Sequence, residues 1–386
     1  MTPAMPKQIG DYNRNQMLTI LRERGPTSRV ELSRLLDLSP PAVTRNIAKM
    51  MTKGIIRECG AEESNMGRKP TLIELCDEYC YVLCADIVGD TLKTAIADLN
   101  GMIVKYSEKP LLKEKGASAV LEQLIDSLQN MIADAKAPKK KIWAAIVGTP
   151  GIFDAEKGRS SFTFFLEGWD DIDIRAKVAE AIGIETIIKN DIDLDVIGES
   201  WKGVGKEYES ILYVKLGQGF AARIVLKDKL LHGLHQMAGE IGYMLPAVPS
   251  AAASNAANYE DMLCNGAVAK RYAGLHGDGK ANTIAELCTL ADNGDSFAEE
   301  VLCDLLDRFA IALLNSIAVL DPHVIILGGD ASCFGERDID ILKRRIEKFF
   351  PLSQNIITST LKNQACLHGA IKTGLDCVEM RINELW

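Results

Sequence analysis

The spacing of apolar residues predicts three short helices in the first 52 positions of the chain. The first covers residues 12–24 and ends at Gly25-Pro26. The second opens at Ser28, and the third has Ser39 as its N-cap and Pro40 at its first helical position, where a missing N–H costs nothing. The residues predicted to form the buried stripes are Met17, Ile20, Leu21, Leu32, Leu35, Leu36, Val43, Ile47, Met50 and Met51.

The opposite face of the third helix carries small, hydroxyl-bearing and cationic side chains that can approach base edges and phosphates, as a recognition helix requires. Two β-prone runs at residues 55–59 and 71–75 flank a polar loop that ends in GRKP, which predicts a two-stranded wing. The alternative is a three-helix protein-docking module with a solvated basic face. The predicted DNA-binding residues are Ser39, Pro41, Thr44, Arg45, Lys49, Arg68 and Lys69.

From about residue 81 the pattern changes to strands that alternate with helices. The first series has strands at 81–88, 92–99, 102–107, 142–148 and 185–189, with a hairpin signal at Asn100-Gly101 and an amphipathic helix from 120 to 132. The second has strands at 211–216 and 222–226 and a helix over 296–320. The repeated scheme predicts an α/β domain of two related lobes, with a ligand site in the cleft between them.

Composition narrows the class of protein. The chain has 386 residues, of which 47% are apolar, so it can bury a large core in two or three compact units. Its start lacks the apolar core of a secretion signal, and its longest apolar stretch, residues 309–320, is too short to span a bilayer. The ten cysteines form no CxxC pair, which is typical of a reducing compartment. We therefore expect a cytoplasmic protein without membrane partners, disulfides or cysteine-bound metal.

The charge is distributed unevenly. Residues 1–72 carry twelve lysines and arginines against seven acids, a net of +5, so the remainder carries −14 of the total of −9. A basic end on an acidic body favours capture of nucleic acid by the N-terminal segment alone, because only that segment neutralises phosphates. The alternative is that this difference in charge is a chance fluctuation along an ordinary enzyme. The helix and wing pattern favours nucleic-acid binding over that alternative.

The run GPTSRVELSRLLDLSPPAVTRNIAKMMTKGIIRECG, followed by GRKP, resembles the winged helix-turn-helix of the ROK repressors, a group that includes xylose and N-acetylglucosamine repressors alongside bacterial sugar kinases. The resemblance extends over nearly the whole chain. It implies a winged helix-turn-helix at residues 1–75, followed by a two-lobed actin-like ATPase fold. The first lobe would take residues 76–195 together with a C-terminal helix at 367–386, and the second lobe residues 196–366.

The family's phosphate loops are altered in this chain. Where the kinases have Asp-x-Gly-Gly-Thr, this chain has DIVGD at residues 86–90, so Val88 adds bulk and Asp90 would place a carboxylate near a polyphosphate. Where they have Gly-Thr-Gly-x-Gly, it has GQGFA at residues 217–221, and only the pair Gly328-Gly329 is kept. The resemblance therefore implies a domain that does not bind ATP productively, has no catalytic residues and needs no cofactor.

The sugar side is better preserved. Asn190-Asp191 matches the family's Asn-Asp pair, whose aspartate accepts a proton from the attacked hydroxyl in kinases. AGEIGY at residues 238–243 matches Ala-Gly-Glu-x-Gly-His, with Tyr243 in place of the histidine. Tyr243 either contacts the ligand or fills the volume. The residues that the resemblance implies for effector binding are Asn190, Asp191, Glu240, Tyr243 and Glu260.

Many family members bind zinc through that histidine and three cysteines. The positions of those cysteines are Ala251, Ala253 and Asn258 here, so no metal is expected.

These features together predict a homodimeric regulator, a repressor of carbohydrate uptake and catabolism genes, and not an enzyme. Its partners would be a palindromic double-stranded DNA operator and a sugar or sugar derivative bound in the cleft. The competing hypothesis is an ATP-dependent sugar kinase with an N-terminal regulatory appendage, which rests on Asp191. A third possibility is a sensor of a partner protein in the sugar-uptake machinery.

Overall fold

The computed structural model describes all residues except 1–5, 62–69, 136, 155–158, 162–165, 228, 247–256, 277–279 and 386. Its N-terminal module has three helices, α1 (Pro6–Arg24), α2 (Arg29–Leu36) and α3 (Pro40–Thr52). They pack against an antiparallel sheet of order β1-β3-β2, formed by Thr27–Ser28, Thr71–Leu75 and Ile56–Ala61. The three predicted helices and the two strands of the wing are confirmed. Helix α1 begins six residues earlier than predicted, and the two-residue strand β1 was not predicted.

The helix starts differ in how they are capped. Ser28 accepts a hydrogen bond from the backbone N–H of Glu31 at 3.3 Å, as its spacing predicts. Ser39 stands at the N-cap position of α3, and Pro40 is the first helical residue, but the Ser39 side chain accepts no capping hydrogen bond. The prediction that Ser39 is the N-cap of this helix is therefore confirmed, without a capping hydrogen bond from its side chain. Pro40 explains part of this, because a proline at the first position already fixes the entry of the chain.

The first lobe is a five-stranded sheet of order β10-β7-β4-β5-β6. Helices α4 (Ala117–Asp134) and α5 (Ile174–Ile182) cover one face, while α6 (Asp191–Lys202) and α12 (Ala365–Asn383) pack on the other. A short hairpin, β8 (Ile152–Asp154) and β9 (Arg159–Ser161), follows β7. The strands of the sheet are β4 (Tyr81–Val88), β5 (Thr91–Asp98), β6 (Ile103–Pro110), β7 (Ile142–Thr149) and β10 (Thr186–Asn190).

The second lobe repeats this arrangement. Its sheet has the order β13-β12-β11-β14-β15, so each lobe combines an antiparallel meander of three strands with two further strands parallel to the first. The two related lobes predicted from the sequence are confirmed. The strands are β11 (Ser210–Leu216), β12 (Phe220–Leu226), β13 (Lys229–Leu230), β14 (Val324–Gly329) and β15 (Ile356–Thr358). The helices are α7 (Tyr259–Leu263), α8 (Asn265–His276), α9 (Ile284–Asp292), α10 (Ser296–Leu320) and α11 (Glu336–Glu347).

Helices α6 and α12 pack closely against each other at the centre of the molecule. A Cβ on Gly198 would overlap the carbonyl oxygen of Ala365, and one on Gly369 would overlap that of Leu194, so only glycine lets the two backbones approach this far. Helix α6 also runs unbroken across the predicted lobe boundary between residues 195 and 196. That boundary therefore falls inside an element that packs against both sheets.

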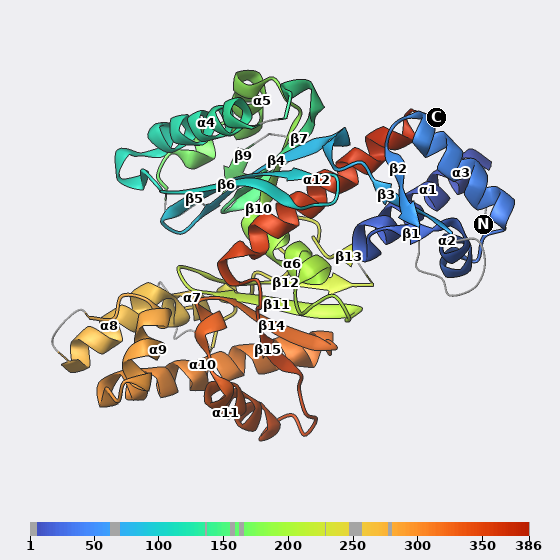
Figure 1. Cartoon of the computed structure of the whole chain (residues 1–386). Coiled ribbons are helices and arrows are strands. Elements are labelled where there is room, and N and C mark those ends of the chain that lie inside the picture. The colour runs from blue at the N-terminus through green and yellow to red at the C-terminus, as the bar shows by residue number, and fades with distance from the viewer. Residues whose placement is uncertain are drawn as a thin grey trace.

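The N-terminal module is docked on the first lobe and on α12. Arg22 of α1 forms an ion pair with Glu379 of α12 at 2.7 Å and donates a hydrogen bond to the carbonyl oxygen of Leu99 at 3.1 Å. One continuous apolar cluster joins the core of the module to the α12 face of the first sheet. Figure 1 shows α12, in red, running from the space between the lobes to the N-terminal module. None of the described helices is long and apolar enough to cross a membrane.

Candidate effector cleft and DNA-binding face

A cavity of about 680 Å³ lies between the two lobes. It is lined by the ends of β4, β10 and β11, by the start of α6 and by loops of the second lobe. All five residues predicted for effector binding line this one cavity: Asn190, Asp191, Glu240, Tyr243 and Glu260. Their contact with an effector stays a prediction.

Asn190 is fixed by the fold. Its Oδ1 accepts hydrogen bonds from the backbone N–H groups of Ile192 and Asp193 at 3.0 and 3.2 Å, which caps α6, and its Nδ2 donates to the carbonyl oxygen of Gly151 at 2.7 Å. One amide N–H is left over for a ligand. A change at this position would therefore disturb the start of α6 as well as the cavity.

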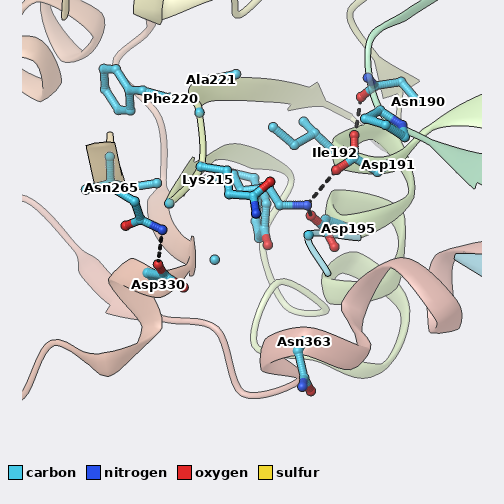
Figure 2. A pocket seen from close by; sticks show the side chains of 18 of the residues that line it. Asn190, Asp191, Ile192, Asp195, Lys215, Phe220, Ala221, Asn265, Asp330 and Asn363 are labelled. Carbon is cyan, nitrogen blue, oxygen red and sulfur yellow. Dashed lines mark hydrogen bonds and ion pairs between the residues drawn. The ribbon is translucent and has the colours of Figure 1, made fainter. Parts of the chain in front are cut away.

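Asp191 is already paired within the chain. The ammonium group of Lys215, on β11, lies 2.7 Å from a carboxylate oxygen of Asp191 and 2.7 Å from one of Asp195 (Figure 2). Burial opposes the charge of Lys215, but the two carboxylates outweigh it and raise its pKa well above the ordinary value. Lys215 thus stays charged and occupies one oxygen of Asp191 in an ion pair.

A second cation, Arg223 of β12, stands beside the sugar-side residues. Its guanidinium binds Asp193 at 2.6 Å and Glu240 at 3.0 Å, and it donates to Oδ1 of Asn190 at 3.3 Å. Its side chain is only 4% exposed. Burial disfavours the charge, whereas Asp193 and Glu240 raise the pKa of Arg223 above its usual value. Glu240 therefore faces the cavity with one oxygen already bound to a buried cation.

Glu260 and Tyr243 line the second-lobe side of the cavity. Burial and the nearby Glu240 raise the pKa of Glu260. The Glu260 carboxylate lies against Gly219 and Gly242, where a side chain would leave it less room. Tyr243 is 43% exposed, so it does not fill a gap in the core, and its hydroxyl is accessible from the cavity side. Tyr243 is the one exposed residue of the predicted set.

Asp90, expected to place a carboxylate near a polyphosphate, lies at the surface. Its side chain is 67% exposed, it pairs with Lys113, and it does not line the cavity. Asp86 and Asp330 do line the cavity, and burial raises the pKa of both, that of Asp86 to about 7. The loops also touch: the place of a Cβ on Gly89 lies 3.7 Å from Nε2 of Gln218. The side chain of Val88 lies outside the described residues.

The predicted loss of the zinc site has a partial structural account. Asn258 is the N-cap of α7 and forms a capping box with Asp261, with hydrogen bonds of 3.0 and 3.2 Å. Ala251 and Ala253 lie outside the described residues. Within the part of the chain that the structure describes, no three His, Cys, Asp or Glu side chains gather closely enough to hold a metal ion.

The predicted recognition face of α3 is open to solvent. Ser39, Pro41, Thr44, Arg45 and Lys49 are all exposed, while Val43, Ile47 and Met50 are buried. Among the described residues, Arg45 and Lys49 form no ion pair. In contrast, the neighbouring arginines 29, 34 and 57 each pair with a glutamate. Arg68 and Lys69 of the wing lie outside the described residues, and contact of any of these side chains with DNA stays a prediction.

The two central cations of the cavity were not predicted. Lys215 stands in a strand directly before the Gly217 loop, and Arg223 interrupts the apolar run of β12. A charged residue inside a strand that is otherwise buried signals a buried partner, since an unpaired charge there would be costly. That signal points to a partner without identifying it, because the paired acids lie on another element, α6.

Comparisons with known proteins cover both parts of the chain. The ROK family model matches residues 82–374, and a model described as winged helix-turn-helix DNA-binding matches residues 11–57. A xylose repressor of Caldicellulosiruptor bescii is 22% identical over 396 residues, 95% of either chain. A glucokinase of Halalkalibacterium halodurans is 26% identical over 280 residues, 68% of this chain and 84% of that one. The crystal structure of a ROK family transcriptional regulator, a homolog of the Escherichia coli Mlc protein, aligns with a TM-score of 0.76 at 19% identity, over 97% of this chain and 98% of that one.

Proposed function

Because the chain belongs to the ROK family, we propose that it is a sugar-responsive DNA-binding regulator, a repressor of carbohydrate uptake and catabolism genes, that does not phosphorylate its sugar. The observation that carries the proposal is the joining of two features in one molecule. A winged helix is docked, through Arg22 and Glu379, on the helix that leads to the cleft, and the cations on its exposed recognition face have no ion-pair partner among the described residues. The similarity to a xylose repressor over 95% of either chain supports it.

The charges in the cleft argue against phosphoryl transfer. A general base needs a free carboxylate within reach of the sugar hydroxyl, but Asp191 is held by Lys215. The altered phosphate loops also argue against productive binding of a nucleotide, because Val88 and Gln218 stand where the family's kinases have a glycine and a threonine.

The competing function is an ATP-dependent sugar kinase, which the similarity to a glucokinase supports. An assay coupled to ADP release over hexoses, pentoses and amino sugars separates the two. We expect no turnover above background with any sugar. Turnover that disappears in an Asp191→Asn variant would establish the kinase instead.

The regulatory half is tested by band-shift titration of the operator region with candidate sugars. We propose a homodimer that binds two half-sites of a palindrome, so that a sugar which changes the closure of the cleft changes the separation of the two α3 helices. A coupling of about 1.4 kcal/mol shifts the affinity for the operator tenfold. Specific DNA binding that ignores every sugar would remove this half of the proposal.

A further inference from the structure

The cavity has a second polar end beyond the predicted sugar site. In Figure 2, Asn265 and Asp330 lie on the opposite side of Lys215 from Asn190 and Asp191. We call Asn190, Glu240, Tyr243 and Glu260 the near half, and Asn265, Asp330 and Ser332 the far half. Both halves line one continuous cavity of about 680 Å³. Cavities of several hundred Å³ typically enclose drug-sized ligands, and a single sugar ring is roughly half that size. This cavity therefore has room for more than one ring.

The far half presents directed hydrogen-bonding groups. Asn265 donates to Asp330 at 2.8 Å and accepts from the backbone N–H of Ile284 at 3.0 Å, which fixes its orientation. Ser332 donates to the carbonyl oxygen of Gly329 at 2.7 Å and keeps its own oxygen as an acceptor. Asp330 has a second carboxylate oxygen that does not take part in the bond from Asn265. These acceptors suit the hydroxyl groups of a carbohydrate.

The charge of the lining disfavours a phosphorylated occupant. Six acids line the cavity, Asp86, Asp191, Asp195, Glu240, Glu260 and Asp330, against the three cations Lys215, Arg223 and Lys362. Lys215 and Arg223 are each held between two carboxylates already, which leaves the exposed Lys362 among the described cations of the lining. A phosphate would enter a net negative site without a free buried cation to pair with. An uncharged ligand with many hydroxyls meets no such cost.

We propose that the effector is an uncharged oligosaccharide of at least two rings, with one ring in the near half and the next in the far half. This inference rests on the proposed function, because it names the ligand of the same cleft. The side chains that we expect to distinguish a two-ring ligand from a single sugar are then Asp330 and Ser332 of the far half, because Asp330 lies on the opposite side of Lys215 from Asn190 and Asp191 (Figure 2).

Isothermal titration calorimetry of the full chain tests the proposal. Two series compare one ring with two or three: xylose, xylobiose and xylotriose, and glucose, cellobiose and maltose. The 6-phosphates of glucose and N-acetylglucosamine test for a charged ligand, and adenosine tests for a nucleoside. We expect one disaccharide to bind at least tenfold more tightly than its own monosaccharide and to weaken operator binding. We expect no binding of the phosphates or of adenosine.

Variants locate the second ring. Asp330→Ala lowers the affinity for the disaccharide to that for the monosaccharide. Ser332→Trp, which fills the far half without removing a charge, does the same and serves as the second test should Asp330→Ala not fold. Glu240→Gln weakens both ligands, and Asp126→Ala, which removes an exposed acid of α4 outside the cavity, weakens neither.

The outcomes are distinguishable. Equal affinity for one and two rings, tight binding of a sugar phosphate or of adenosine, or equal loss of both ligands in the far-half variants overturns the inference and leaves the regulator intact. Failure of every carbohydrate to bind or to change operator affinity overturns the proposed function as well.

Discussion

Lys215 holds two buried carboxylates together, so its removal leaves Asp191 and Asp195 without a counter-charge. We predict that Lys215→Met destabilises the fold by roughly 3–5 kcal/mol at pH 8, because breaking a buried pair from one side strands the remaining charge. The loss shrinks toward pH 5, since the stranded carboxylates can then be protonated. Urea unfolding at several pH values measures both effects.

A matched control is available at the surface. Lys206 lies 3.7 Å from Glu23, and both side chains are more than a third exposed. Lys206→Met should cost less than about 1 kcal/mol at any pH, because water screens such pairs. If the two lysine variants behave alike, the Lys215 pair contributes nothing that an exposed pair does not.

Asp86 gives the cleft a pH dependence of its own. It is fully buried, and burial raises its pKa from 3.8 to about 7, although the Cys366 thiol and Lys215 oppose the shift. A raised carboxyl pKa favours the protonated folded state, so its contribution to stability is complete below pH 4 and declines as the pH rises to about 7.

The Asp86→Asn variant should therefore become more stable relative to the natural chain as the pH rises. The difference in unfolding free energy between the two should change by up to about 4 kcal/mol between pH 4 and pH 8, in favour of the variant. Chemical denaturation across this range supplies the measurement. A difference that does not vary with pH would mean that Asp86 is ionised at neutral pH.

At the residue scale, the sequence revealed features that depend on neighbouring residues, but not contacts between residues that are far apart in the chain. The anchors Asn190, Glu240 and Glu260 carry local patterns, so the structure finds them at one cavity. The pairing of Lys215 with Asp191 and of Arg223 with Asp193 joins different elements and depends on how β11 and β12 lie against α6. Local spacing cannot express such contacts, and they decide the chemistry of the cleft.

At the scale of elements, α3 offers a quantitative test of DNA binding. Lys49 is exposed near the end of α3 and has no ion-pair partner among the described residues, so a phosphate would be its counter-charge. Lys49→Ala should weaken binding to all sequences alike and reduce the slope of log affinity against log salt by about 1. Arg45→Ala should also relax sequence preference if its guanidinium reads a base edge.

The control for these two variants is Arg34→Ala on α2, whose guanidinium is paired with Glu31 at 2.6 Å. It should change neither the slope nor the preference. An unchanged slope in Lys49→Ala, measured by fluorescence anisotropy at several salt concentrations, would place DNA on another face of the module.

Long periodic elements were predicted well, and short or tertiary ones were not. The amphipathic stripe of α4 and the apolar run of β4 are local properties, so their positions could be read from the sequence. Strand β1 is two residues long and exists only because β3 pairs with it. The continuity of α6 past residue 195 likewise depends on its packing with α12, where Gly198 and Gly369 allow close approach.

For the whole molecule, the geometry of α12 links the two proposed activities. Its N-terminal end brings Cys366 beside Asp86 at the cleft, and its C-terminal end brings Glu379 to Arg22 and Asn383 to Asn15 of α1 (Figure 1). Its N-terminal half also packs on α6, whose N-cap is Asn190. A ligand that moves the start of α6 thus acts through packed helices on the docking of the DNA-binding module.

The Arg22–Glu379 pair is the place where this coupling can be broken. Both side chains are nearly buried, at 5% and 13% exposed, so Glu379→Met leaves the Arg22 charge without its partner and should cost roughly 3–5 kcal/mol of docking stability. The module should still bind the operator, but the sugar should no longer change that affinity.

The double variant Arg22→Met, Glu379→Met should regain much of the stability, because an apolar pair of similar volume replaces the ions. Arg24→Met, which removes an exposed partner of Glu31, is the control. Operator titrations with and without sugar measure the coupling, and a full sugar response in Glu379→Met would show that the signal reaches the DNA-binding module by another route.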